Sequence, residues 1–143
     1  MLSTALLQDI ATTVAWALNE DLGQDLALAP KHRATELDIT AALIPQTNNA
    51  IATIINREDC IVCGVAWVTE VFKQLDTALG HSEAEQTKIT WFVNDGQMAK
   101  ANTVLCELSG NARALLTGER VALNFLQTLS GTATLTSHYV KEL

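Results

Sequence analysis

Apolar residues recur at spacings of three or four in three segments, the pattern of helices that bury one face. The first segment spans residues 6–22 and ends before Gly23, a residue typical of helix C-termini. The second begins after Gly64 and ends at Gly80. The third and longest, 112–129, follows Ser109-Gly110-Asn111, whose side chains can cap a helix. We expect Ser130-Gly131 to interrupt this helix or to pack tightly, with helical spacing then resuming towards Leu143.

β-branched and aromatic residues mark three probable strands between these helices. They cover residues 50–56, 89–93 and 104–108, with an Asn94-Asp95-Gly96 turn between the last two. Residues 23–38 lose the helical period and collect Pro30 and basic residues, which indicates a surface loop. The order of elements predicts an α+β fold with a mostly antiparallel sheet and a long C-terminal helix.

Composition narrows the class of protein further. The 143 residues, of which 48% are hydrophobic, suit one globular domain and leave no room for a two-domain enzyme. Nine Lys and Arg against sixteen Asp and Glu give a charge of −7, which disfavours nucleic-acid binding. With no apolar run of about 18 residues and no basic leader, we expect a cytoplasmic protein without a membrane segment. Three cysteines, an odd number, indicate free thiols rather than a disulfide framework.

Two arginines are candidates for binding an anion. Arg113 and Arg120 lie seven positions apart on the longest predicted helix, and so within about 20° of one another around its axis. The planar guanidinium makes two parallel bonds to a carboxylate or phosphate. From spacing alone, the favoured interpretation is a solvated pair of arginines, or arginines paired with Glu107 or Glu119.

Two further motifs have ordinary interpretations that we favour. Cys60 and Cys63 form a C-x-x-C pair, but a second pair is missing, so buried small residues beside a turn explain them better than a metal site. The histidines are scattered, at His32, His81 and His138. Lys100 follows Asp95-Gly96 and invites comparison with the modified lysine of biotin or lipoyl carrier domains, yet a solvated surface lysine is favoured. No nucleophile triad or phosphate-binding glycine loop is found.

Residues 118–134, GERVALNFLQTLSGTAT, resemble the signature of the quinolinate phosphoribosyltransferase family. Shorter motifs of that family recur in the same order along nearly the whole chain. They are Glu20-Asp21-Leu22-Gly23, Asp38-Ile39-Thr40, Leu43-Ile44-Pro45, Arg57-Glu58, Cys63-Gly64, Phe72 with Leu75-Asp76, and Asp95-Gly96. The resemblance implies that residues 1–143 form the family's N-terminal α/β sandwich of the hammerhead type, ending where a C-terminal α/β barrel would begin.

The resemblance also implies an activity. The family transfers a phosphoribosyl group from phosphoribosyl pyrophosphate to quinolinate with Mg²⁺, and releases carbon dioxide and pyrophosphate to give nicotinate mononucleotide. Its members are homodimers in which the arginine matching Arg120 reaches the partner's barrel domain and binds a quinolinate carboxylate; a role for Arg113 is left open. The family's barrel segments do not occur in these residues, so we expect no catalytic residue and no Mg²⁺ site here, and no catalysis by residues 1–143 alone.

The chain departs from the family pattern at positions other than Arg120. Val121 stands where many relatives have threonine, and Cys60 where glycine is usual. Two alternatives stay open. One is a relative of the same fold, such as the molybdenum-transport-associated protein or nicotinate phosphoribosyltransferase, which would change the ring substrate. The other is a non-catalytic carrier or interaction module.

Overall fold

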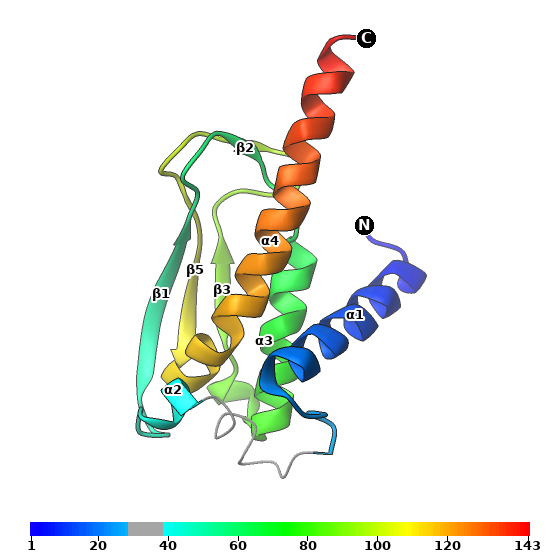
Figure 1. Cartoon of the computed structure of the whole chain (residues 1–143). Coiled ribbons are helices and arrows are strands. Elements are labelled where there is room, and N and C mark those ends of the chain that lie inside the picture. The colour runs from blue at the N-terminus through cyan, green and yellow to red at the C-terminus, as the bar shows by residue number, and fades with distance from the viewer. Residues whose placement is uncertain (29–38) are drawn as a thin grey trace.

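The computed structural model describes residues 1–28 and 39–143, and its helices pack beside a small antiparallel sheet (Figure 1). The helices are α1 (Thr4–Leu22), α2 (Ile39–Ala42), α3 (Val65–Leu79), the 3₁₀ turn η1 (Glu83–Glu85) and α4 (Ala112–Lys141). The strands are β1 (Asn49–Ile55), β2 (Cys60–Ile61), β3 (Lys88–Trp91), β4 (Met98–Ala99) and β5 (Val104–Asn111). The predicted loop at residues 23–38 falls for the most part outside the described residues.

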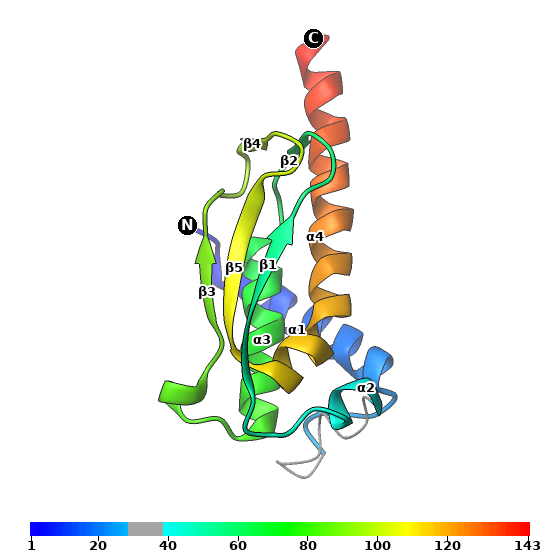
Figure 2. The ribbon, with the colours of Figure 1, turned by 90° about the vertical axis from the view of Figure 1, so that its left-hand side faces the viewer.

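Every strand pair among the described residues is antiparallel. β5 is the central strand of the order β1-β5-β3, and β2 pairs with β4 in a separate short ladder (Figure 2). Thr53 and Thr90 both lie opposite Glu107, so the three strands share one register. These findings confirm the α+β class, the antiparallel sheet and the long C-terminal helix.

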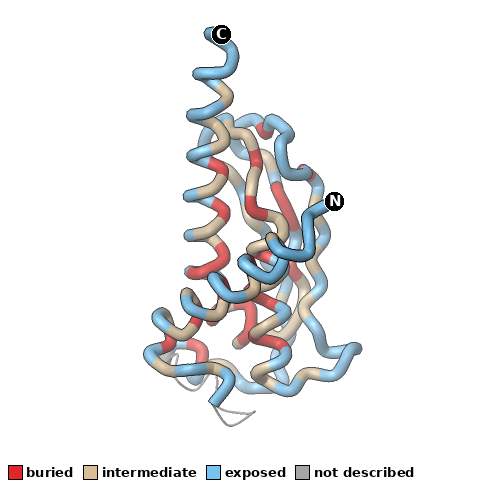
Figure 3. The backbone as a smooth tube through the Cα atoms, turned by 90° about the vertical axis from the view of Figure 1, so that its right-hand side faces the viewer, coloured by how far each residue is buried: buried red, intermediate tan, exposed pale blue. Residues whose placement is uncertain are grey.

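The core lies between the sheet and the helices. α1, α3 and α4 turn their buried positions inward, whereas the C-terminal turns of α4 project beyond the sheet and are exposed (Figure 3). β5 supplies Leu105, Cys106 and Leu108 from the sheet. α1 contributes Val14 and Leu18, both fully buried, at the helical spacing expected from the sequence. None of the described helices is both long and apolar enough to cross a bilayer.

Helix ends follow the residues that the sequence marks. Asn111 caps α4 by accepting hydrogen bonds from the backbone amides of Arg113 and Ala114. Gly23 and Gly80 end α1 and α3 in the left-handed conformation. α3 is capped from a distance, because one Asp95 carboxylate oxygen accepts from the amides of Gly64 and Val65 at 2.8 and 3.1 Å. The two motifs Cys63-Gly64 and Asp95-Gly96 therefore meet in space.

Our expectation of an interruption at Ser130-Gly131 was wrong. α4 runs without a break to Lys141, since glycine in a helix interior costs only about 1 kcal/mol and does not stop the helix. The alternative, tight packing, holds for Ser130, which is buried, but not for Gly131, where an added Cβ would meet no atom within 4 Å. α2, η1, β2 and β4 were not predicted; each spans four residues or fewer, too few for a periodic pattern to be visible.

Gly118 sets how closely α4 approaches α3. A Cβ at this position would lie 2.5 Å from Phe72 Cε1 and 2.9 Å from Leu75 Cδ1. The two helices therefore touch backbone to side chain, at a distance that a larger residue would prevent. The first residue of the long signature thus has a packing role.

We expect Gly118→Ala to lower the free energy of unfolding by about 1–3 kcal/mol, because the new methyl group overpacks the contact with Phe72. Gly131→Ala in the same helix is the matched control: its methyl group meets only open space, and the better helix propensity of alanine should raise stability by up to about 1 kcal/mol. Urea unfolding of both variants measures the difference. Equal effects would contradict the close contact.

Candidate functional site

Arg120 lies in α4 and forms a two-point ion pair with Asp21 from the end of α1. Its Nε donates to Asp21 Oδ1 at 2.7 Å, and Nη2 donates to Oδ2 at 3.2 Å. The Arg120 side chain is 71% exposed, whereas that of Asp21 is only 17% exposed. The guanidinium is therefore held at its inner edge and stands at the protein surface.

Arg120 is one of the residues that line a surface groove of about 540 Å³. Thr40 of α2 lines it on one side, and α4 contributes the other residues. These are Leu116, Glu119, Arg120, Leu123, Asn124 and Gln127. An exposed, oriented arginine in a groove with amide side chains can bind a carboxylate or phosphate by charge-assisted hydrogen bonds.

The partner of Arg120 differs from the one that helix spacing suggested. We considered Glu107 and Glu119, but Arg120 forms an ion pair with Asp21, 99 positions away in sequence. Glu107 lies on β5 opposite Thr53 and Thr90. Spacing along α4 predicts only partners close in sequence. The end of α1 lies beside α4 only because the two helices pack together in the folded protein. Asp21 is thus a residue of the site that sequence reasoning missed, although it stands in the Glu20-Asp21-Leu22-Gly23 motif.

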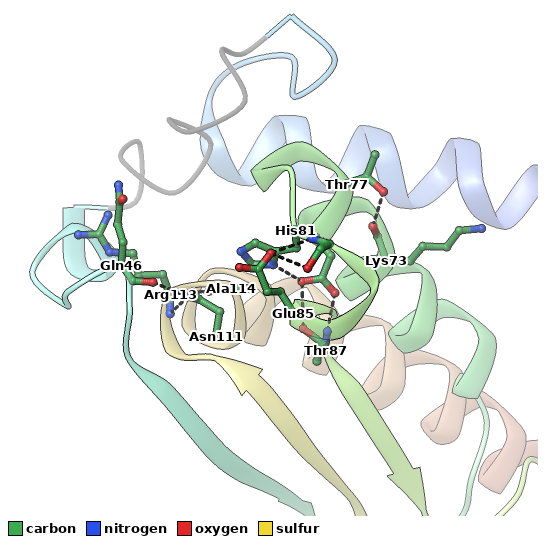
Figure 4. Close-up of polar contacts among 11 residues, drawn as sticks. Gln46, Lys73, Thr77, His81, Glu85, Thr87, Asn111, Arg113 and Ala114 are labelled. Carbon is green, nitrogen blue, oxygen red and sulfur yellow. Dashed lines mark hydrogen bonds and ion pairs between the residues drawn. The ribbon is translucent and has the colours of Figure 1, made fainter.

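Arg113 binds backbone carbonyls rather than a side-chain acid. Its Nε donates to the Ile44 carbonyl, and Nη2 donates to the Ala42 carbonyl at 3.2 Å. Beside it, the Asn111 side chain donates to the Gln46 carbonyl at 2.6 Å (Figure 4). These bonds tie the segment after α2 to the start of α4. The structure thus gives Arg113 a structural contact, and its participation in ligand binding stays a prediction.

A second polar cluster joins the end of α3 to the start of β3. Asp76, 3% exposed, accepts from the Thr87 amide at 2.8 Å and lies 2.7 Å from His81 Nδ1 (Figure 4). His81 and Glu85 also line a cavity of about 460 Å³ together with Arg113. Because Asp76 is saturated by local partners, the cluster explains how α3, η1 and β3 are held together.

The second half of the signature fastens α4 to β2. The Ser130 hydroxyl accepts from the Cys63 amide at 3.0 Å and donates to the Cys63 carbonyl at 3.1 Å. One turn later, Thr134 Oγ1 accepts from the Ile61 amide at 2.9 Å. Ile61 ends β2 and Cys63 lies two residues beyond it, so helix hydroxyls complete hydrogen bonds of β2 and of the segment that follows.

The cysteines and Lys100 have ordinary surroundings. Cys60 and Cys63 are half-buried around β2, and Cys106 is buried in β5. Lys100 is exposed and lies 3.3 Å from Asp59. Within residues 1–28 and 39–143, no three His, Cys, Asp or Glu side chains converge as a metal would require.

Comparison with known proteins decides the family. A sequence profile described as "Quinolinate phosphoribosyl transferase, N-terminal domain" matches residues 38–130. The nicotinate-nucleotide pyrophosphorylase [carboxylating], chloroplastic, of Oryza sativa subsp. japonica is 33% identical over 129 residues, which cover 90% of this chain. The chain belongs to the quinolinate phosphoribosyltransferase family.

Solved structures of nicotinate-nucleotide pyrophosphorylases share the fold. The enzyme from Francisella tularensis superposes with a TM-score of 0.69 at 38% identity, over 92% of this chain and 41% of that one. The enzyme from Ehrlichia chaffeensis gives a TM-score of 0.72 at 29% identity, over 99% of this chain and 42% of that one. The chain spans 30% of the length of the rice relative. Because that relative is described as chloroplastic, compartments can differ within the quinolinate phosphoribosyltransferases, and the cytoplasm stays a prediction for this chain.

We expect Ser130→Ala to lower the free energy of unfolding by about 1–3 kcal/mol, because it leaves the partly buried amide and carbonyl of Cys63 without this partner. Ser137→Ala is a control within the same helix, since that hydroxyl donates only to the Thr134 carbonyl of its own helix, and we expect a change below about 0.5 kcal/mol. Thermal and urea unfolding compare the two. A neutral Ser130→Ala would contradict the proposed fastening of β2.

Burial raises the pKa of the Cys106 thiol from 9.0 to about 11. At pH 8 the native protein should therefore carry about 100-fold less Cys106 thiolate than an ordinary thiol, and iodoacetamide should label it correspondingly slowly. As the pH rises, this thiol ionises at a lower pH in the unfolded chain than in the native protein. The contribution of the neutral Cys106 thiol to stability is therefore fully present below pH 9 and is lost as the pH rises towards 11. Peptide mass spectrometry of labelled native and urea-unfolded protein measures this; equal rates would contradict the burial.

Proposed function

We propose that this chain is the N-terminal domain of a quinolinate phosphoribosyltransferase and that Arg120 binds a carboxylate of quinolinate. The observation that carries the proposal is the exposed side chain of Arg120, which pairs with Asp21 and lines a groove of mixed polar and apolar residues. The chemistry of the site supports it, because quinolinate offers two adjacent carboxylates to a planar, permanently charged donor.

The reaction transfers the phosphoribosyl group of phosphoribosyl pyrophosphate to the ring nitrogen of quinolinate. Pyrophosphate is the leaving group of this transfer. The adduct then loses carbon dioxide and becomes nicotinate mononucleotide. Arg120 contributes binding and orientation: by fixing a carboxylate it directs the ring nitrogen towards the sugar carbon, which replaces a bimolecular encounter by a positioned one. No residue of this domain acts as an acid, base or nucleophile in the proposal.

The remainder of the active site belongs, in the proposal, to a C-terminal barrel domain of the partner subunit in a homodimer. Two facts support this. The chain spans 30% of the rice relative and 41% of the Francisella protein, and Arg120 points its exposed end away from its own core. Residues 1–143 without a barrel domain are therefore expected to have no activity.

Mg²⁺ accompanies phosphoribosyl pyrophosphate in the proposed reaction, where it would offset the charge of the pyrophosphate group. Among residues 1–28 and 39–143, no three His, Cys, Asp or Glu side chains converge, and the proposal leaves the ion with phosphoribosyl pyrophosphate and the barrel domain. We assign Mg²⁺ no ligand here and no step in what this domain does.

The proposal predicts the kinetics of Arg120→Ala in the protein that joins this domain to a barrel domain. Losing one strong carboxylate contact should raise the quinolinate KM, or reduce kcat/KM, by at least about tenfold. Lys73→Ala is the charge control, because Lys73 is an exposed cation on α3 and lies outside the groove. Steady-state assays with varied quinolinate measure both, and unchanged kinetics in Arg120→Ala would remove the proposed role.

A further inference from the structure

His81 has one ring nitrogen that the fold does not use. Its Nδ1 lies 2.7 Å from Asp76 Oδ1, whereas Nε2 makes no hydrogen bond with any described residue. The side chain of His81 is largely covered, with 15% exposed. Nε2 is nevertheless not among the buried nitrogen and oxygen atoms that lack a partner, so it is open to solvent. The opening is the cavity of about 460 Å³ that His81 lines.

The partners of Asp76 decide which nitrogen of the neutral His81 ring carries the hydrogen. The Thr87 backbone amide can only donate, and it donates to Asp76 Oδ2 at 2.8 Å. The Thr87 hydroxyl donates to Asp76 Oδ1 at 3.3 Å. Asp76 therefore acts as an acceptor throughout, and the Nδ1 of His81 supplies the hydrogen of their contact. The neutral ring then presents the lone pair of Nε2 to the cavity, where it can accept a hydrogen bond from a ligand.

Two side chains of opposite charge line the same cavity. Hydrogen bonds from the amide and the hydroxyl of Ser82 lower the pKa of Glu85, so this carboxylate is ionised at neutral pH. Both bonds go to Oε2, which leaves Oε1 for a ligand. Arg113 supplies the positive charge (Figure 4). Its Nε and Nη2 donate to backbone carbonyls, while Nη1 has no partner among the described residues.

Two helix ends of opposite polarity also line the cavity. Leu79 and Gly80 end α3, where the partial negative charge of the helix favours a cation. Asn111 and Arg113 begin α4, where the partial positive charge of the helix favours an anion. The helix ends and the charged side chains therefore have the same polarity, negative at the end of α3 with Glu85 and positive at the start of α4.

This distribution of charge disfavours a ligand with a single charge. A simple anion would be repelled by Glu85 and a simple cation by Arg113, and such repulsion is stronger in a partly enclosed cavity than in water. A zwitterion can satisfy both ends. The amide side chains of Gln46 and Asn49 line the cavity as well and offer further donors and acceptors to a polar ligand.

We propose that this cavity binds a small zwitterion of the amino-acid type. Its ammonium group donates to His81 Nε2 and Glu85 Oε1, and its carboxylate accepts from Arg113 Nη1. The bound molecule connects the end of α3 to the start of α4, so it should stabilise the folded domain. The cavity shares no described residue with the groove that Arg120 lines, and the inference therefore does not depend on the proposed function.

The test is a calorimetric titration of this chain with amino acids of increasing length. Glycine, β-alanine and 4-aminobutyrate carry the same two charges at different separations, whereas acetate and methylamine carry one charge each. We expect one of the three amino acids to bind with a Kd of about 1 mM and to raise the thermal midpoint. Each single-charge probe should bind at least about tenfold more weakly, because it loses one charge-assisted contact.

A pair of substitutions in η1 locates the binding site. Glu85→Gln removes the charge, while the amide oxygen can still accept from Ser82, and we expect it to weaken binding at least about tenfold. Glu83→Gln is the matched control, because Glu83 is an exposed acid of the same turn and does not line the cavity. It should change the Kd less than about twofold. The thermal midpoint of each variant without ligand checks that it is folded.

Chemical modification reports on the His81 nitrogen directly. Diethyl pyrocarbonate acylates the unprotonated nitrogen of an imidazole, and peptide mass spectrometry gives the rate at each histidine. At about three times its Kd, the amino acid that binds should slow the modification of His81 about fourfold. His138 is exposed on α4 and serves as the internal standard, whose rate should not change. Methylamine at the same concentration corrects for reagent that amines consume.

Several results would overturn the proposal. If none of the three amino acids binds, the cavity is not a site for small zwitterions. Binding that Glu85→Gln leaves unchanged, or that does not protect His81, would place the ligand elsewhere on the protein. If acetate binds as tightly as the amino acids, the ammonium contacts of the proposal are wrong.

Discussion

The close packing of α4 on α3 at Gly118 is the constraint on which the rest of the molecule depends. With no side chain at this point, the backbone of α4 approaches Phe72 and Leu75 more closely than any other residue would allow. Together with the hydrogen bonds of Ser130 and Thr134 near the other end of α4, this contact sets the course of the rigid helix. The position of Gly118 therefore also determines where Arg120, two residues later, and Ser130, three turns later, can reach.

Along α4 the family signature separates into residues with different physical tasks. Gly118 provides the close approach, Arg120 stands at the surface paired with Asp21, and Ser130 and Thr134 bond to Cys63, just after β2, and to Ile61 within it. Of these four residues, only Arg120 presents a charged group at the surface. A motif that appears as a single functional block in sequence is thus mostly a set of packing and hydrogen-bonding requirements, around one residue suited to a ligand.

The Asp21–Arg120 pair also joins the first and the last helix of the domain. α1 contributes an anchored carboxylate and α4 an exposed guanidinium, so the geometry of the candidate site depends on how both helices pack on α3. Surface ion pairs contribute little to stability, about 0–1 kcal/mol.

The sequence by itself determined the helices, the principal strands and their caps, because apolar periodicity and residues such as Gly23, Gly80 and Asn111 act through neighbours a few positions away. It also identified the family and singled out Arg120 through the signature. Tertiary structure alone decided that Arg120 meets Asp21, that Arg113 binds a carbonyl at the end of α2, and that Asp95 caps α3. These partners are 31 to 99 positions apart, and only packing of the helices and sheet around the common core brings them within hydrogen-bonding distance.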